Sequence, residues 1–180
     1  TQSNISSLIF PQHLGEVKFE ESSFAKSNIE NMIIPIGTKV DTIAESAFAL
    51  TLKLKTFDLS QAETSGSLKI NESAFICSSV KNLKLPNAKA ICFGEECLYH
   101  VGISDLIIPE CTRDIIFGKN CFKNSVIGEI KFLSESEYTE DDGCPRGTKI
   151  KFMEGSFSGC DILAREIHFP KKADRRRLLR

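Results

Sequence analysis

The chain has 180 residues, of which 41% are hydrophobic, and its 23 basic and 24 acidic residues leave a net charge of −1. This length predicts one domain, and no apolar run approaches the roughly 20 residues that a membrane-spanning helix needs. The charge is balanced overall, so the charged segments described below are local features.

The first ten residues, TQSNISSLIF, lack the basic start and the long apolar stretch of a signal peptide. Ile5, Leu8, Phe10 and Pro11 match the second half of a pattern that recurs through the rest of the chain. Because the sequence starts inside this pattern, we expect it to be a processed or trimmed piece of a longer protein.

One pattern recurs six times after this half unit. Each copy has two apolar residues at i and i+2, then a turn around a large apolar anchor, then a second such pair, which a proline follows in four copies. In the clearest copy the pairs are Leu68/Ile70 and Leu83/Leu85, and Pro86 follows. The six anchors are Phe24, Phe48, Phe75, Leu98, Phe122 and Phe157.

The spacing of this pattern predicts a solenoid. Residues at i and i+2 share one face of a strand, so each copy supplies two short half-buried strands joined by a turn. A single copy cannot bury its apolar side, whereas stacked copies share a continuous core. We therefore predict a right-handed, β-rich solenoid over residues 1–170, with parallel strands and about six and a half repeats of 23–26 residues. The six full units are 17–35, 40–60, 68–86, 91–109, 115–133 and 150–170.

Two segments interrupt or follow the repeats. Residues 134–148, SESEYTEDDGCPRGT, form an insertion with five acidic residues and one arginine. Such insertions map to one face of a repeat array, which is often a binding face, and the alternative is a solvated loop. Residues 171–180, KKADRRRLLR, form a basic tail without the aromatic residues that stack on bases. We therefore expect no nucleic-acid partner, and the tail either serves an anionic membrane or an acidic partner or is a trailing disordered end.

The seven cysteines and three histidines do not form a recognisable chemical site. Cys97 and Cys121 stand in the slot before the anchor that alanine fills in other units, which predicts buried core positions. Cys92, Cys97, His100 and Cys111 have no standard zinc spacing, so we expect neither a metal nor a cofactor. No nucleophile elbow, P-loop or dinucleotide fingerprint is present, so we expect no enzymatic activity.

The outward positions of the second strands form a candidate contact surface. Strands about 4.8 Å apart would align these seven residues in a row roughly 30 Å long. Exposed apolar residues in a contiguous patch indicate a contact site, and three of the seven are isoleucines. The row consists of Ile9, Ile33, Asp58, Lys84, Ile107, Lys131 and His168.

The repeat resembles the BspA-type leucine-rich repeat of bacterial and protist surface proteins. The resemblance rests on IAESAF from Ile43, INESAFICSSVKNLKLP from Ile70 and GSFSGCDIL from Gly155, and Leu98 departs from it in the anchor slot. It implies a leucine-rich solenoid that binds a protein partner without chemistry, as an adhesin-like protein at the cell surface or secreted. The alternative is an intracellular structural or regulatory scaffold in a larger assembly, with other subunits or flanking repeats. Free cysteines would favour the cytoplasm.

Overall fold

The computed structural model describes residues 6–12, 14–109, 112–133 and 149–163. The insertion at 134–148 and the tail at 171–180 lie outside these residues, and the domain boundaries stay predictions. The described part of the chain contains strands and turns and no helix.

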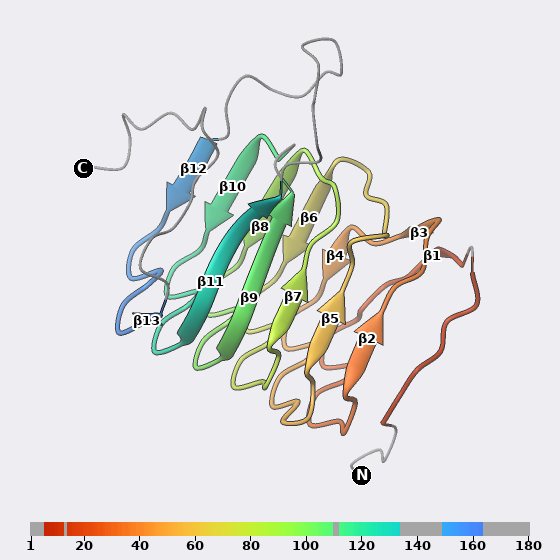
Figure 1. The fold of residues 1–180 in the computed structure, drawn as a ribbon, viewed down its shortest axis with the longest axis horizontal. Helices are drawn as coiled ribbons and strands as arrows, with labels where there is room; N and C mark the ends of the chain where they lie inside the picture. Colours follow the sequence, from red (N-terminus) through yellow and green to blue (C-terminus); the bar gives the residue numbers. More distant parts are fainter. Residues whose placement is uncertain (1–5, 13, 110–111, 134–148, 164–180) are drawn as a thin grey trace.

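Two parallel sheets face each other across the core, and successive coils supply one strand to each sheet (Figure 1). All of the strand pairings are parallel. The predicted β-solenoid is therefore confirmed. The five-stranded sheet contains β4 (Thr42–Ile43), β6 (Ser67–Ile70), β8 (Ala90–Phe93), β10 (Asp114–Phe117) and β12 (Lys149–Phe152). The six-stranded sheet contains β2 (Asn31–Ile33), β5 (Thr56–Asp58), β7 (Asn82–Lys84), β9 (Gly102–Pro109), β11 (Val126–Leu133) and β13 (Asp161–Ile162).

A small third sheet forms from the links between the first repeat units. Strand β1 (Gly15–Glu16) pairs with β3 (Thr38–Lys39), and Lys39 also pairs with Glu63. These residues lie in the links before the first, second and third units, and they form an added side of the coil. Val40, one position earlier than the regular pattern, is fully buried, so the slip in sequence is absorbed without loss of the core.

Each turn around the anchor contains two residues in the left-handed region, two positions before and two positions after the anchor. Ser73 and Cys77, with φ of 53° and 53°, flank Phe75 in this way. The flanking pairs in the six turns are Ser22/Lys26, Ser46/Leu50, Ser73/Cys77, Glu96/His100, Asn120/Asn124 and Gly155/Gly159. Residues other than glycine rarely adopt this conformation, so a structural requirement must hold them in it.

That requirement is a ladder of hydrogen bonds between stacked turns. In the third unit the N–H groups of Ser73, Phe75 and Cys77 donate to the carbonyls of Glu95, Cys97 and Tyr99 at 3.0, 2.8 and 2.9 Å. The same three bonds join the turns of all neighbouring described coils. The left-handed residues thus aim their N–H groups along the solenoid axis, and the turns form a third hydrogen-bonded column beside the two sheets.

The anchors stack on one another inside the solenoid. The rings of Phe24, Phe48 and Phe75 follow one another at centroid distances of 5.2 and 5.2 Å with nearly parallel planes. Leu98 is fully buried in the same column, and Phe122 and Phe157 resume the stack beyond it at 5.0 Å. Leucine therefore fills the anchor slot without changing the fold.

The last described coil is less buried than the repeat pattern predicts. Ile150 and Phe152 occupy inward positions of β12, and Phe152 stacks on Phe117 at 5.1 Å. However, Ile150 is only half-buried and Phe152 is 38% exposed. The reason is that β12 is the edge strand among the described strands of its sheet and pairs there with β10 alone. Its inward residues are therefore covered by a neighbouring strand on one side only.

Candidate protein-interaction face

The structure aligns five of the seven candidate residues in one row across the six-stranded sheet. Ile33 pairs with Asp58, Asp58 with Lys84, Lys84 with Ile107, and Ile107 with Lys131. Ile33 is 58% exposed, and the other four are partly exposed. We call these five residues the strand row. They lie side by side on the outer face of β2, β5, β7, β9 and β11.

The two remaining candidates lie at the ends of the row. Ile9 is 94% exposed, and Ser7, two residues before it, pairs with Asn31 of β2. The register therefore continues the row from Ile33 to Ile9. His168 lies outside the described residues.

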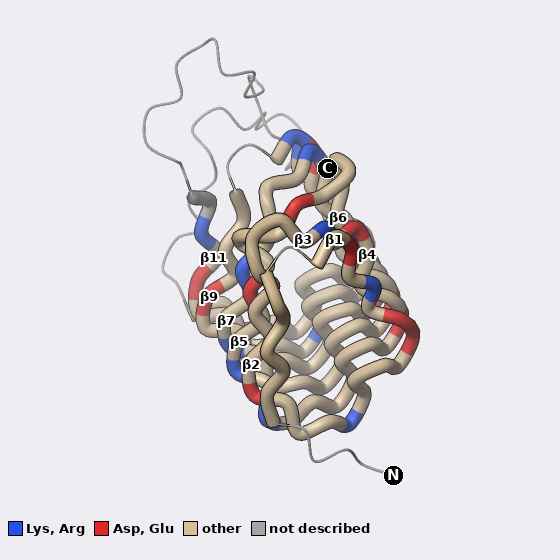
Figure 2. The backbone as a smooth tube through the Cα atoms, turned by 90° about the vertical axis from the view of Figure 1, so that its right-hand side faces the viewer, with Lys and Arg blue, Asp and Glu red and all other residues tan. Residues whose placement is uncertain are grey.

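Ion pairs between neighbouring strands hold the charged side chains of the row. Lys84 Nζ donates to Asp58 Oδ2 at 2.8 Å, and Lys131 Nζ donates to Asp105 Oδ1 at 2.8 Å. Lys131 also lies 3.2 Å from Glu129. Figure 2 shows basic and acidic residues close together along this edge of the stack. The charges of the row are thus neutralised within the protein, so the face has no strong field of one sign.

Asp58 is the most enclosed of these charged groups, with 15% of its side chain exposed. Burial alone would raise the pKa of Asp58, but hydrogen bonds from Lys84 Nζ and from the backbone N–H and hydroxyl of Ser60 outweigh it and lower this pKa. Hydrogen bonds to Asp105 and Glu129 raise the pKa of Lys131. Both side chains therefore remain charged at neutral pH in fixed positions.

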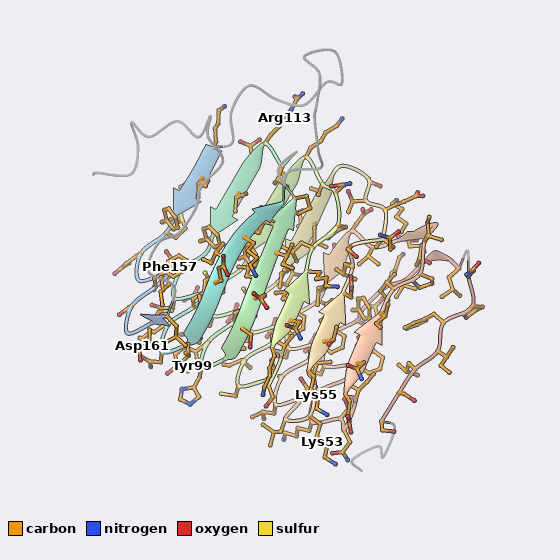
Figure 3. All side chains as sticks on the ribbon, in the orientation of Figure 1. Lys53, Lys55, Tyr99, Arg113, Phe157 and Asp161 are labelled. Atoms are coloured by element: carbon orange, nitrogen blue, oxygen red, sulfur yellow. The ribbon has the colours of Figure 1, made fainter. Side chains whose placement is uncertain are left out.

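A further ion pair flanks the row. Lys55 Nζ donates to Glu30 Oε2 at 2.9 Å, directly before β5 and β2 begin. Figure 3 shows Lys55 at the foot of β5. The side chains of Lys55 and Glu30 are 62% and 40% exposed, and pairs this open to solvent contribute little to stability. The most enclosed charge of the face is therefore Asp58.

The turns carry an acidic column that the sequence analysis missed. Three positions before the anchor, consecutive units have Glu21, Glu45, Glu72 and Glu95, all of them exposed. The fifth unit has Lys119 there, 3.8 Å from Glu95. Aligning the units on the anchor and comparing the polar positions as well as the apolar ones would have found this column.

The described cysteines are all unpaired thiols. Cys97 and Cys121 are buried as predicted, and burial raises the pKa of both thiols. Burial also raises the pKa of Cys160 to about 11. Thiols with a raised pKa are poor nucleophiles and poor metal ligands, so these cysteines act as small apolar core residues.

The described residues contain no cluster of His, Cys, Asp or Glu side chains suited to a metal ion. Cys111, one of the four residues whose spacing was compared with zinc sites, lies outside the described residues. Within the same residues, no helix has the length and hydrophobicity required to cross a membrane.

The fold and this face define a class of protein: a parallel β-solenoid of short repeats that exposes one sheet face of isoleucines and paired charges. The family model of the BspA type leucine rich repeat region matches residues 1–129 with six copies. The chain belongs to this family, whose repeats are protein-interaction modules and are generally non-enzymatic. Comparison with curated proteins and with solved structures gave no match.

Proposed function

We propose that the chain is a non-enzymatic binding module that contacts a protein partner through the strand row and Ile9. The observation that carries the proposal is the exposure of isoleucines in one register: Ile9 is 94% and Ile33 is 58% exposed, and Ile107 lies farther along the same row. Apolar residues at the centre of an interface supply most of its binding energy when the contact excludes water.

The paired charges shape the contact rather than drive it. Because Asp58 is held by Lys84, and Lys131 by Asp105, these side chains have already lost much of their freedom before a partner arrives. Ordering long side chains at an interface costs about 0.5–1.5 kcal/mol each. A pre-ordered row lowers that cost and leaves the isoleucines as the anchors.

The test replaces Ile33 and Ile107 with serine in one chain. Bound proteins are captured by cross-linking in the native extract and compared by mass spectrometry for the wild type, this variant and a matched control. The control replaces Leu52, in the turn before β5, and Met153, directly after β12 of the opposite sheet, with serine; these side chains are 68% and 41% exposed. We expect the row variant to lose partners that the control retains.

An unchanged partner set for the row variant would refute the role of the row. Circular dichroism and the thermal midpoint should match the wild type in both variants, because all four side chains point outward. Lys131 is not replaced. A glutamate at this position would be a third carboxylate beside Asp105 and Glu129, and their repulsion would affect the fold as well as binding.

Two settings for this binding differ in the state of the cysteines. As an adhesin-like surface protein, the chain would meet an oxidising environment, whereas an intracellular scaffold would keep its thiols free. The unpaired thiols of the described part favour the scaffold. Intact mass after alkylation of natively purified, denatured protein distinguishes them: seven modified cysteines support the scaffold, and paired cysteines or glycan mass at Asn4 or Asn71 support the surface protein.

A further inference from the structure

The outer face of the five-stranded sheet carries a group of exposed cations that have no acidic partner in the described part of the chain. We propose that this group, together with the apolar residues between its members, binds an acidic segment of a second protein. We call this surface the basic patch. It lies on the sheet opposite the strand row, so it is a separate site. Its cations are Lys69, Lys89, Arg113, Lys149 and Lys151.

The register of the sheet brings these five cations together. Lys69 of β6 and Lys151 of β12 stand at the two ends of one cross-strand row, with two apolar residues between them. Lys149 stands two positions before Lys151 and therefore on the same face of the strand. Lys89 and Arg113 directly precede β8 and β10, and Arg113 N–H donates to Lys89 O at 2.9 Å. Figure 3 shows Arg113 extending from the start of β10.

The charges of the basic patch are not neutralised within the described part of the chain. No carboxylate there forms an ion pair with any of the five cations. Asp114, paired with Lys149 in the register, is the one acidic residue of β6, β8, β10 and β12, and the acidic column lies in the turns beyond these strands. On the six-stranded sheet, by contrast, carboxylates hold Lys84 and Lys131 at 2.8 Å. Unpaired charge of one sign attracts a partner of the opposite sign.

The centre of the basic patch is apolar. Ala90 and Cys92 point outward from β8, and Ile116 points outward from β10, where it pairs with Cys92. All three residues are partly buried. The patch thus has an apolar centre within a charged rim, which is the arrangement of a protein interface.

An acidic protein segment fits this surface better than an anionic membrane does. Binding at a membrane surface relies on large apolar side chains that enter the acyl boundary, and the partly buried Ile116 does not project in this way. Lys69 and Lys151 are three strand spacings apart, about 14 Å at about 4.8 Å each. About four residues of an extended segment cover this distance. A short segment with acidic ends and an apolar middle therefore reaches both lysines and the centre.

The first experiment measures the binding of fluorescein-labelled peptides to the full chain by fluorescence polarisation. The probe is EEELEEE, and the controls are QQQLQQQ, which has no charged side chain, and EEESEEE, which has no apolar residue. We expect saturable binding of the probe that weakens as sodium chloride rises. EEESEEE should bind about fivefold more weakly than the probe, and QQQLQQQ should not bind.

Two triple variants separate the basic patch from the charge of the whole chain. The patch variant replaces Lys89, Arg113 and Lys149 with glutamine. It should bind the probe at least about tenfold more weakly than the wild type, whereas the control variant should bind within about twofold. Both variants have the same net charge, and both should keep the wild-type melting curve because the replaced residues are exposed. The control replaces three exposed lysines outside the patch with glutamine: Lys26, Lys53 and Lys81.

Cys92 provides a second measurement that needs no variant. Its thiol is unpaired and partly exposed at the centre of the basic patch, and Cys77 is an unpaired, partly exposed thiol in a turn outside the patch. The bound probe should slow the alkylation of Cys92 by iodoacetamide and leave the rate at Cys77 unchanged. Mass spectrometry of the digested chain measures both rates.

Four results would overturn the proposal. The first is the absence of saturable probe binding at about 1 mM chain, and the second is equal binding by the patch and control variants. The third is binding to phosphatidylserine vesicles, lost in the patch variant, by a chain that binds EEELEEE no better than QQQLQQQ; a membrane would then be the partner. The fourth is probe binding only after the five acidic residues of 134–148 are replaced by their amides, which would make this insertion the occupant.

Discussion

The left-handed residues beside each anchor show how single positions are constrained by the stacking of coils. Leu50 has φ of 57° and is 40% exposed, and its N–H donates to Ile76 O at 2.9 Å. Its conformation serves the bond between turns and not the packing of its side chain. A left-handed conformation costs a non-glycine residue about 1–2 kcal/mol, and glycine avoids most of this cost.

We expect Leu50→Gly to be more stable than Leu50→Ala by about 1 kcal/mol in chemical denaturation. The matched pair is Lys53→Gly and Lys53→Ala, at an exposed residue with no positive φ, where glycine should be the less stable of the two. If alanine were the better residue at both sites, the turn geometry would not be what restrains Leu50.

Phe75 is the central member of the anchor stack and is fully buried. Its ring lies 5.2 Å from Phe48 and 5.0 Å from Phe57. Phe75→Ala should lower the free energy of unfolding by about 3–5 kcal/mol, because it leaves a cavity between coils that cannot close. Phe75→Leu should cost much less, since Leu98 already fills the equivalent slot. A loss under about 1 kcal/mol for alanine would mean that the neighbouring coils collapse into the space.

At the scale of the strand, the ion pair between Asp58 of β5 and Lys84 of β7 links two coils. Asp58→Asn should lower stability by about 1 kcal/mol at neutral pH, because it removes the charge from a partly enclosed hydrogen-bonded pair. The pKa of Asp58 is lowered from its ordinary value of 3.8 in the folded chain. Its contribution is therefore complete above that ordinary value and is lost as the pH falls through the lowered folded pKa.

Urea titrations of the wild type and of Asp58→Asn, from pH 7 to pH 2, measure how the contribution of Asp58 to stability depends on pH. The difference in stability between the wild type and Asp58→Asn should shrink below about pH 4. Glu30→Gln, which removes a partner of the exposed Lys55, is the control and should leave the midpoint almost unchanged. A difference that is constant with pH would show that the carboxylate charge of Asp58 does not stabilise the fold.

The acidic column is the opposite case, in which neighbouring coils carry like charges. Glu72 stands between Glu45 and Glu95 in successive turns, and adjacent strands in a sheet are about 4.8 Å apart. Glu72→Lys should raise stability by about 0.5 kcal/mol at low salt, and Glu72→Gln should give a smaller gain. Both gains should fall as sodium chloride rises, because salt screens exposed charges. A gain independent of salt would point to a change in turn propensity.

The apolar pattern predicted the strands and the strand row because stacking imposes the same register on every coil. Ile33 and Ile107, which are three coils apart in the repeat alignment, lie in one row as expected. What the pattern could not reveal is polar and conformational: the pairing of Lys131 with Asp105, or the positive φ of Cys77. Serine, glutamate, cysteine and histidine occupy left-handed positions in four of the six turns, so residue type alone does not mark these positions. Tertiary hydrogen bonds select that conformation.

At the scale of the whole molecule, each coil touches only its neighbours, so stability depends on position along the stack. Central coils are held on both sides, whereas the coil of β12 and β13 packs on one described neighbour in each sheet. Phe157 lies in this end coil (Figure 3), and its ring contacts Phe117 and Phe122 at 5.5 and 5.0 Å. The end coil should therefore open locally, without the rest of the chain.

Native-state hydrogen exchange followed by mass spectrometry tests this order of stability. Amides of residues 68–108 should be the most protected and those of residues 149–163 the least. Phe157→Ala should lower protection in residues 149–163 alone, whereas Phe75→Ala should lower it throughout the central coils, because their interfaces depend on that ring. A uniform loss of protection from Phe157→Ala would mean that all of the coils unfold as one unit. If the stability of the stack is a sum of interfaces between neighbouring coils, the effect of a substitution decreases with distance from the altered coil. The loss of protection from Phe157→Ala should therefore stay local.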